Sequence, residues 1–122
     1  MRPIYSIVAP VYNEEGNLAK FYERVANTMN SLDEAWELVL VNDGSRDGSL
    51  DIMRELAETD SHVKYVNFAR NFGHQTAVTA GIDYATGKAV ILIDSDLQDP
   101  PEVIADLIAE WKNGFEVVYA VR

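Results

Sequence analysis

The sequence of 122 residues has no cysteine, few basic residues and no long apolar run. The absence of cysteine excludes disulfide bonds and thiolate metal sites. Ten Lys and Arg against twenty Asp and Glu give a formal charge of -10, which argues against a nucleic-acid partner because phosphate backbones bind clustered cations. No stretch approaches the roughly 20 apolar residues that span a bilayer, and the N-terminus lacks the apolar region of a signal peptide. We therefore expect a soluble segment that faces the cytoplasm.

The composition, with 48% hydrophobic and 25% charged residues, is typical of a single globular domain, here over residues 1–122. Short apolar runs predict strands at residues 6–11, 37–42, 63–68, 89–94 and 115–120. Apolar residues spaced three or four apart predict helices at residues 18–29, with Asn17 as N-cap, and at 50–57, 74–85 and 103–111. This alternation predicts an α/β fold: a Rossmann-like, mainly parallel open sheet with helices on both faces.

Two of the apolar runs, at residues 38–41 and 90–93, are continuous rather than alternating. Continuous runs are typical of central parallel strands that are covered on both faces. In such a sheet the loops that follow the strands share one edge, and ligands bind at that edge. The polar loops after the first, second and fourth strands therefore form the candidate site.

The first two of these loops carry groups suited to a nucleoside. Tyr12 offers a stacking surface and Glu14 a hydrogen-bond acceptor, and Asp43 ends a buried strand where its carboxylate could accept from a nucleobase. Both loops also fit ordinary turns before helices, in which Asn13 and the acids suit a helix N-terminus and Asp43 precedes a turn glycine. Taken alone, each loop leaves both interpretations open.

The third loop, residues 94–101, contains Asp94 and Asp96 in a D-x-D pattern. A chain with ten Asp contains this pattern about once by chance, so its position after a buried strand carries the weight. Two carboxylates this close repel each other unless a cation compensates them. Oxygen ligands select Mg²⁺ or Mn²⁺, which also bind substrate phosphates. The alternative is a pair of surface acids that cap the following helix.

Five segments together resemble family 2, GT-A-type glycosyltransferases. The segments at 10–14, 41–45 and 94–101 carry the family pattern. Those at 69–77 and 81–87 are similar to the branch that acts on polyprenyl phosphates, which includes dolichyl-phosphate mannose synthases and bacterial undecaprenyl-phosphate glucosyl- and aminoarabinosyltransferases. The resemblance spans nearly the whole chain, and its specificity comes from the correct order of the loops.

The resemblance implies roles for individual residues. The implied nucleotide-binding residues are Pro10, Tyr12, Glu14, Asp43, Arg70, Asp94, Ser95 and Asp96. Asp96 is the implied metal ligand, Gln98 the second, and Asp94 an alternative. Arg70 could instead be a solvated or structural cation. His74 is expected to pack or hydrogen-bond at a helix start, and we do not predict it to be a catalytic base.

The implied reaction moves a hexosyl group from a nucleoside diphosphate sugar, with a UDP-sugar favoured, to a polyprenyl phosphate, and uses Mg²⁺ or Mn²⁺. In the family, the acceptor-side residues and membrane segments lie beyond the fifth strand, so we expect the acceptor-side catalytic residues beyond Arg122. We therefore expect this chain to be the donor- and metal-binding part of a membrane-anchored protein and to be inactive alone. Oligomeric state and donor sugar stay open.

Two other functions remain open beside this one. A nucleotidyltransferase could use the same acids and metal, although the sequence lacks a Gly-rich basic loop near the first strand. A non-catalytic, Mg²⁺-binding interaction domain could share the fold. A dinucleotide-binding dehydrogenase is disfavoured, because residues 13–17 do not form the required G-x-G-x-x-G pattern.

Overall fold

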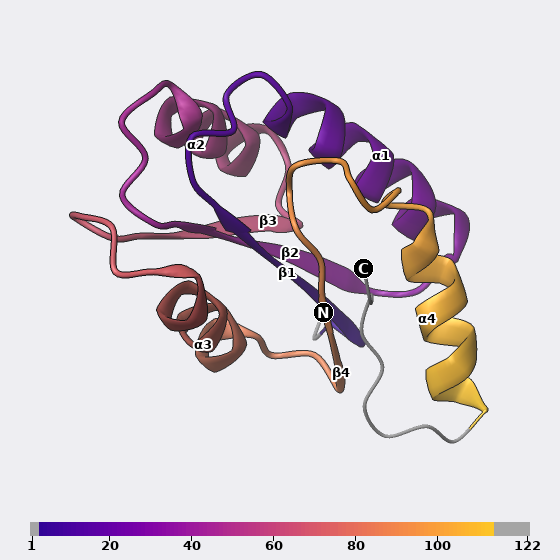
Figure 1. Ribbon diagram of the computed structural model, residues 1–122. Helices are drawn as coiled ribbons and strands as arrows, with labels where there is room; N and C mark the ends of the chain where they lie inside the picture. Colours follow the sequence, from indigo (N-terminus) through magenta and orange to yellow (C-terminus); the bar gives the residue numbers. More distant parts are fainter. Residues whose placement is uncertain (1–2, 114–122) are drawn as a thin grey trace.

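The computed structural model describes residues 3–113 and contains four strands and four helices in strict alternation (Figure 1). In chain order they are β1 (Tyr5–Val11), α1 (Leu18–Ser31), β2 (Trp36–Asn42), α2 (Ser49–Thr59), β3 (Val63–Asn67), α3 (His74–Tyr84), β4 (Ala89–Leu92) and α4 (Val103–Lys112). Within residues 3–113, no helix is long and apolar enough to cross a bilayer.

Two expectations from the sequence concern the last part of the chain. The strand predicted at residues 115–120 lies outside the described residues, and so does Arg122. The location of the acceptor-side catalytic residues beyond Arg122 therefore stays a prediction.

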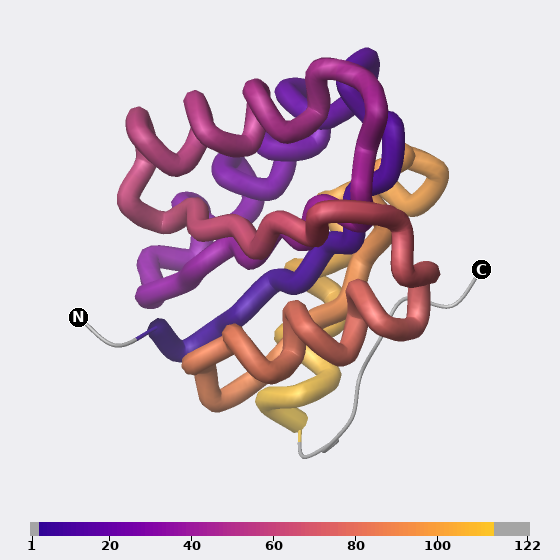
Figure 2. Tube along the Cα trace, turned by 90° about the vertical axis from the view of Figure 1, so that its left-hand side faces the viewer, coloured from indigo at the N-terminus to yellow at the C-terminus, as the bar shows by residue number. Residues whose placement is uncertain are grey.

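The four strands form one parallel sheet in the order β3-β2-β1-β4. The order reverses after β3, because β4 pairs with the free side of β1. The loops after β1 and β4 therefore diverge from a switch point, which is where open α/β sheets bind ligands. Figures 1 and 2 show α2 and α3 on opposite sides of the sheet, so the predicted α/β architecture is confirmed.

Alternate residues of β1 and β2 build two separate cores. Ile7 and Leu38 face the larger core with α1, α2 and α4, whereas Val8, Val39 and Val41 face α3. All five side chains are fully buried, as the continuous apolar run at residues 38–41 predicted. Burial on both faces holds the carboxyl ends of the central strands in place.

The predicted strand at residues 89–94 is two residues too long, and Pro10 gives the reason. The carbonyl of Val8 accepts a hydrogen bond from the N–H of Ile93 at 3.1 Å, so alternate residues of β1 face β4. Pro10 is the next residue on that side and has no N–H to donate. Its carbonyl instead accepts from the Ser95 hydroxyl at 2.9 Å. The ladder therefore ends at Leu92, and the chain is free to turn toward the ligand edge.

The prediction that residues 90–93 are covered on both faces is only partly correct. Ile91 and Ile93 are buried in the larger core, but Val90 and Leu92 are only half-buried against the smaller one. In residues 3–113, α3 is the helix on that face, and it packs on β1 and β2. The side of β4 that faces α3 is consequently less covered.

Asn17 precedes α1 as predicted, but its side chain makes no capping hydrogen bond. The backbone of Asn17 is already helical, whereas a capping side chain needs an extended backbone at that position. Its amide instead donates to Glu14 Oε2 at 3.0 Å. Asn17 thus connects the helix start to a residue of the candidate site.

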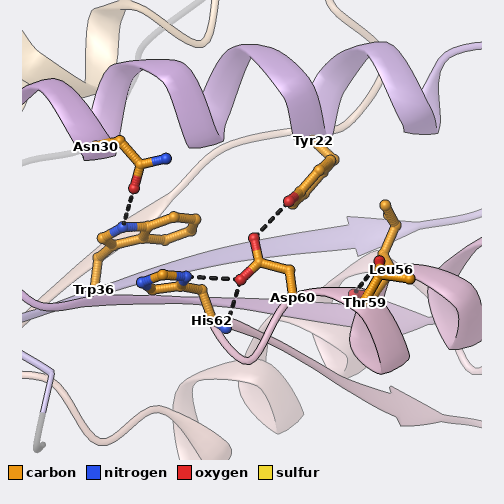
Figure 3. Close-up of polar contacts among 7 residues, drawn as sticks. All are labelled: Tyr22, Asn30, Trp36, Leu56, Thr59, Asp60 and His62. Carbon is orange, nitrogen blue, oxygen red and sulfur yellow. Dashed lines mark hydrogen bonds and ion pairs between the residues drawn. The ribbon is translucent and has the colours of Figure 1, made fainter.

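Two polar clusters stabilise the end of the sheet opposite the candidate site, where the strands begin. In the first, Asp60 accepts from the Tyr22 hydroxyl at 2.5 Å and lies 2.7 Å from His62 Nδ1 (Figure 3). The His62 ring stacks on Trp36, whose indole N–H donates to Asn30. Burial and the bond to Asp60 raise the pKa of Tyr22 to about 12. The cluster fastens the α2–β3 turn to α1 and β2.

The second cluster centres on the buried carboxylate of Glu37. It accepts from the Ser6 hydroxyl at 2.5 Å and the Thr86 N–H at 2.8 Å, and it pairs with Lys64 at 2.8 Å. Burial alone would raise the pKa of Glu37, but these donors outweigh burial and lower it below the ordinary value. The cluster anchors the segment that follows α3 to the sheet.

Candidate functional site

A cavity of about 320 Å³ opens at the carboxyl ends of β1, β2 and β4. Its lining combines carboxylates with one exposed aromatic ring. The lining residues are Pro10, Val11, Tyr12, Glu14, Asp43, Asn71, Gly73, His74, Asp94, Ser95 and Asp96. The loops after all four strands contribute, so segments far apart in sequence form one site.

The loop after β1 supplies the aromatic surface of the cavity. Tyr12 lies at the end of the strand and is 46% exposed, although Val11 beside it is fully buried. An exposed ring next to a rigid strand end is available for stacking against a flat ligand. Glu14, two residues on, places a carboxylate on the same wall.

The loop after β2 supplies Asp43, which is buried and already accepts two hydrogen bonds. Its Oδ1 accepts from the Phe72 N–H at 2.8 Å, and its Oδ2 accepts from the Asn71 side-chain amide at 3.2 Å. A Cβ at Gly44 would lie 2.3 Å from the backbone of Asn71, so the two loops touch directly. Asp43 therefore holds the loop after β3 against the cavity, and a carboxylate still has lone pairs for a ligand.

The loop after β4 places two carboxylates on either side of a buried serine. The Ser95 hydroxyl is bound to Pro10, while Asp94 and Asp96 line the cavity. Asp96 Oδ1 also accepts from the Gln98 N–H at 3.1 Å, and Leu97 between them has a φ of 65°. This tight turn keeps both acids at the end of the strand.

The donor set fits a metal that is shared with a ligand. In residues 3–113, no three His, Cys, Asp or Glu side chains are grouped to hold a metal. A closed, all-protein site is therefore absent from the described part of the chain. Mg²⁺ and Mn²⁺ need only one or two carboxylates when phosphates and waters complete the shell. Asp94 and Asp96 meet that requirement.

Two predicted residues do not reach this cavity. Arg70 lines a neighbouring cavity of about 390 Å³, where its guanidinium lies 4.8 Å from the ring centre of Phe72. Gln98 is absent from the lining of both. Tyr12 and Asn71 line both cavities, so Arg70 lies next to the site rather than in it.

Sequence reasoning missed Asn71 and Gly73 as site residues. Asn71 bonds both the carbonyl and the carboxylate of Asp43, and Gly73 lines the cavity just before α3. His74 also lines the cavity, at the first residue of α3. The available signal was the position of all three residues between the third predicted strand, which ends at residue 68, and the start of the following helix at residue 74.

Comparison with known proteins decides the family. Residues 6–122 match the sequence profile of the family described as "Glycosyl transferase family 2". The chain belongs to glycosyl transferase family 2. This membership confirms the resemblance and favours a glycosyltransferase over the nucleotidyltransferase and interaction-domain alternatives.

Curated relatives of this glycosyltransferase chain come from several bacteria. The uncharacterized glycosyltransferase YkcC of Bacillus subtilis (strain 168) is 56% identical over 118 residues, which is 97% of this chain and 36% of that protein. The undecaprenyl-phosphate 4-deoxy-4-formamido-L-arabinose transferase of Salmonella choleraesuis (strain SC-B67) is 42% identical over 96% of this chain and 36% of that protein. The chain thus spans about a third of the length of these relatives.

Solved glycosyltransferases confirm the GT-A fold. The mannosyltransferase PcManGT from Pyrobaculum calidifontis, in complex with GDP-Man and Mn²⁺, superposes with a TM-score of 0.75 at 25% identity, over 91% of this chain and 32% of that one. Staphylococcus aureus TarS 1-349, in complex with UDP-GlcNAc, has a TM-score of 0.70 at 23% identity, over 93% of this chain and 32% of that one. The second likeness supports the fold alone.

Proposed function

We propose that the protein transfers a hexosyl group from a nucleoside diphosphate sugar, with a UDP-sugar favoured, to a polyprenyl phosphate. Residues 1–122 form its donor- and metal-binding part. The observation that carries the proposal is the cavity at the switch point, which is lined by the exposed Tyr12 and by the acids Asp94 and Asp96. The arabinose transferase relative supports the acceptor class, because its name specifies undecaprenyl phosphate.

Each wall of the cavity has a role in the proposal. Tyr12 stacks on the nucleobase, Asp43 accepts from its edge, and Glu14 faces the nucleoside. Ser95, held by its bond to Pro10, keeps the ribose and diphosphate close to the end of β4. Arg70 in the neighbouring cavity supplies a cation toward the same ligand.

Mg²⁺ or Mn²⁺ would be held by Asp96 and Asp94, which both line the cavity, whereas the predicted second ligand Gln98 does not line it. When bound, the metal stabilises the charge that develops on the leaving diphosphate. Mn²⁺ in the PcManGT complex supports a divalent cation here. The phosphate acceptor is already anionic, so the donor side needs no strong base. In the whole protein this site faces the cytoplasm beside a membrane that carries the acceptor.

Calorimetric titration of the chain with UDP and with GDP, each with and without Mn²⁺, tests the proposal. We expect UDP to bind the wild-type chain only when Mn²⁺ is present. In Asp96→Asn, we expect Mn²⁺ to have no effect on UDP binding. Asp106→Asn removes the same charge from an exposed position of α4 and is expected to leave binding unchanged. A folded chain that binds neither nucleotide would contradict the donor site, and a preference for GDP would overturn the uridine assignment alone.

A further inference from the structure

The loops after β1 and β2 are joined by hydrogen bonds that run in both directions. Backbone N–H groups of residues 13–15 donate to side chains of the second loop and of the first residue of α2. The acceptors are Ser45 Oγ at 3.0 Å, Ser49 Oγ at 2.9 Å and Asp47 Oδ2 at 3.1 Å. In return, Asn13 Oδ1 accepts from the Arg46 N–H at 2.8 Å and Glu15 Oε2 accepts from the Gly48 N–H at 2.9 Å.

This reciprocal pattern makes each loop depend on the other for its shape. The N–H groups of residues 13–15, Arg46 and Gly48 lie outside the strands and donate to side chains across the two loops rather than within a strand or helix ladder. If either loop moved away, these N–H groups would lose their acceptors, and the lost hydrogen bonds would raise the free energy of the chain. The two loops therefore hold one shared conformation at the edge of the cavity.

Asn13 has the most demanding position in this pattern. Its backbone adopts a φ of 52°, a conformation that Asn tolerates better than most residues with a Cβ. Its N–H donates to Ser45 while its side chain accepts from Arg46. Tyr12 and Glu14 on either side both line the cavity, but Asn13 does not. The left-handed turn at Asn13 thus sends its two neighbours to the ligand wall.

We propose that Asn13 is a positioning residue for nucleotide binding: it fixes Tyr12 and Glu14 in the cavity by locking the first loop onto Arg46 of the second. This inference rests on the proposed function, because it names the residue that shapes the same site. Asn13 touches no ligand in this role. Its effect on nucleotide affinity passes through the hydrogen bond to Arg46 and through the backbone turn.

Variants of Asn13 separate the side-chain bond from the backbone turn. Asn13→Gly keeps the left-handed backbone but loses the acceptor, and we expect UDP affinity to fall about fivefold. Asn13→Ala loses both and is expected to lower it at least tenfold. Asn13→Asp keeps an acceptor oxygen and a tolerated turn, so it should remain within about threefold of the wild type.

Asp33 provides a matched control at the opposite edge of the sheet. It is exposed in the turn between α1 and β2 and has a φ of 53°, so Asp33→Ala imposes the same backbone change far from the cavity. We expect Asp33→Ala to bind UDP and Mn²⁺ like the wild type. Equal losses of affinity in Asn13→Ala and Asp33→Ala would show a general loss of stability and overturn the positioning role.

Amide hydrogen exchange of the nucleotide-free chain tests the loop coupling directly. Asn13→Ala is expected to speed exchange at Arg46 and Gly48 at least tenfold, whereas Asp33→Ala and Asn13→Asp leave these amides protected. Wild-type titration with UDP tests the proposed function by itself. A wild type that binds UDP beside an Asn13→Ala variant of equal affinity, or of unchanged exchange at Arg46, overturns the positioning role alone.

Discussion

Replacing Gly81 by alanine tests how closely α3 lies on the sheet. An alanine Cβ would lie 2.3 Å from Val8 Cγ1 and 3.1 Å from Val41 Cγ2, and both valines are fully buried. Overpacking at such a contact costs about 1–3 kcal/mol. Replacing a helical glycine by alanine regains about 1 kcal/mol of helix propensity. We therefore expect the free energy of unfolding to fall by about 1 kcal/mol.

Urea unfolding of Gly81→Ala beside Gly16→Ala measures this effect. No atom lies within 4 Å of a Cβ at Gly16, so that variant should match or exceed the wild type in stability. Because α3 begins at His74 on the cavity wall, a shifted α3 should also weaken UDP binding. A Gly81→Ala chain more stable than the wild type would refute the close packing from which the magnitude is derived.

Three further predictions concern the polar clusters at the opposite edge of the sheet. Glu37→Gln should lower the free energy of unfolding by about 2 kcal/mol, measured by urea unfolding, because Lys64 loses its buried partner. Tyr22→Phe should lower it by about 1 kcal/mol in the same assay, because Asp60 loses a hydrogen bond. The pKa values of Glu37 and Asp60 are lower in the folded chain despite burial, because hydrogen bonds favour the carboxylates. Their stabilisation is therefore complete above the ordinary carboxyl pKa and lost as pH falls through the lowered values, which thermal melts from pH 7 to pH 2 would show.

Within residues 3–113, the local sequence pattern was sufficient to predict the type and order of the helices and strands. A continuous apolar run marked residues 38–41 as a central strand, and three-and-four spacing marked α1 from Leu18. The early end of β4 was not predicted, because it depends on the absence of an N–H at Pro10 in a different strand. The pairing of β4 with β1 likewise joins residues more than 80 positions apart and leaves no local signal.

The sequence predicted which residues gather at the candidate site, but it did not predict the hydrogen bonds between them. Tyr12, Asp43 and Asp96 follow three parallel strands, and parallel strands end at one edge, so their meeting in one cavity follows from the topology. The bonds from Asp43 to the loop at residues 71–72 have no counterpart in the sequence pattern, because a carboxylate after a strand fits a structural role as well as a ligand role. The hydrogen bond from the Arg46 N–H to Asn13 Oδ1 was not predicted either, because an Asn after a strand also fits an ordinary turn.

Paramagnetic broadening of the chain's amide NMR signals by Mn²⁺, in the presence of UDP, tests the donor site most directly. We expect broadening to be strongest at residues 94–98, to extend to Tyr12 and Glu14, and to disappear in Asp96→Asn. Residues 33–36 and 60–62 at the opposite edge of the sheet should stay sharp. Broadening centred on those segments, or broadening at residues 94–98 that persists in Asp96→Asn, would contradict the placement of the metal and the nucleotide at the carboxyl ends of β1 and β4.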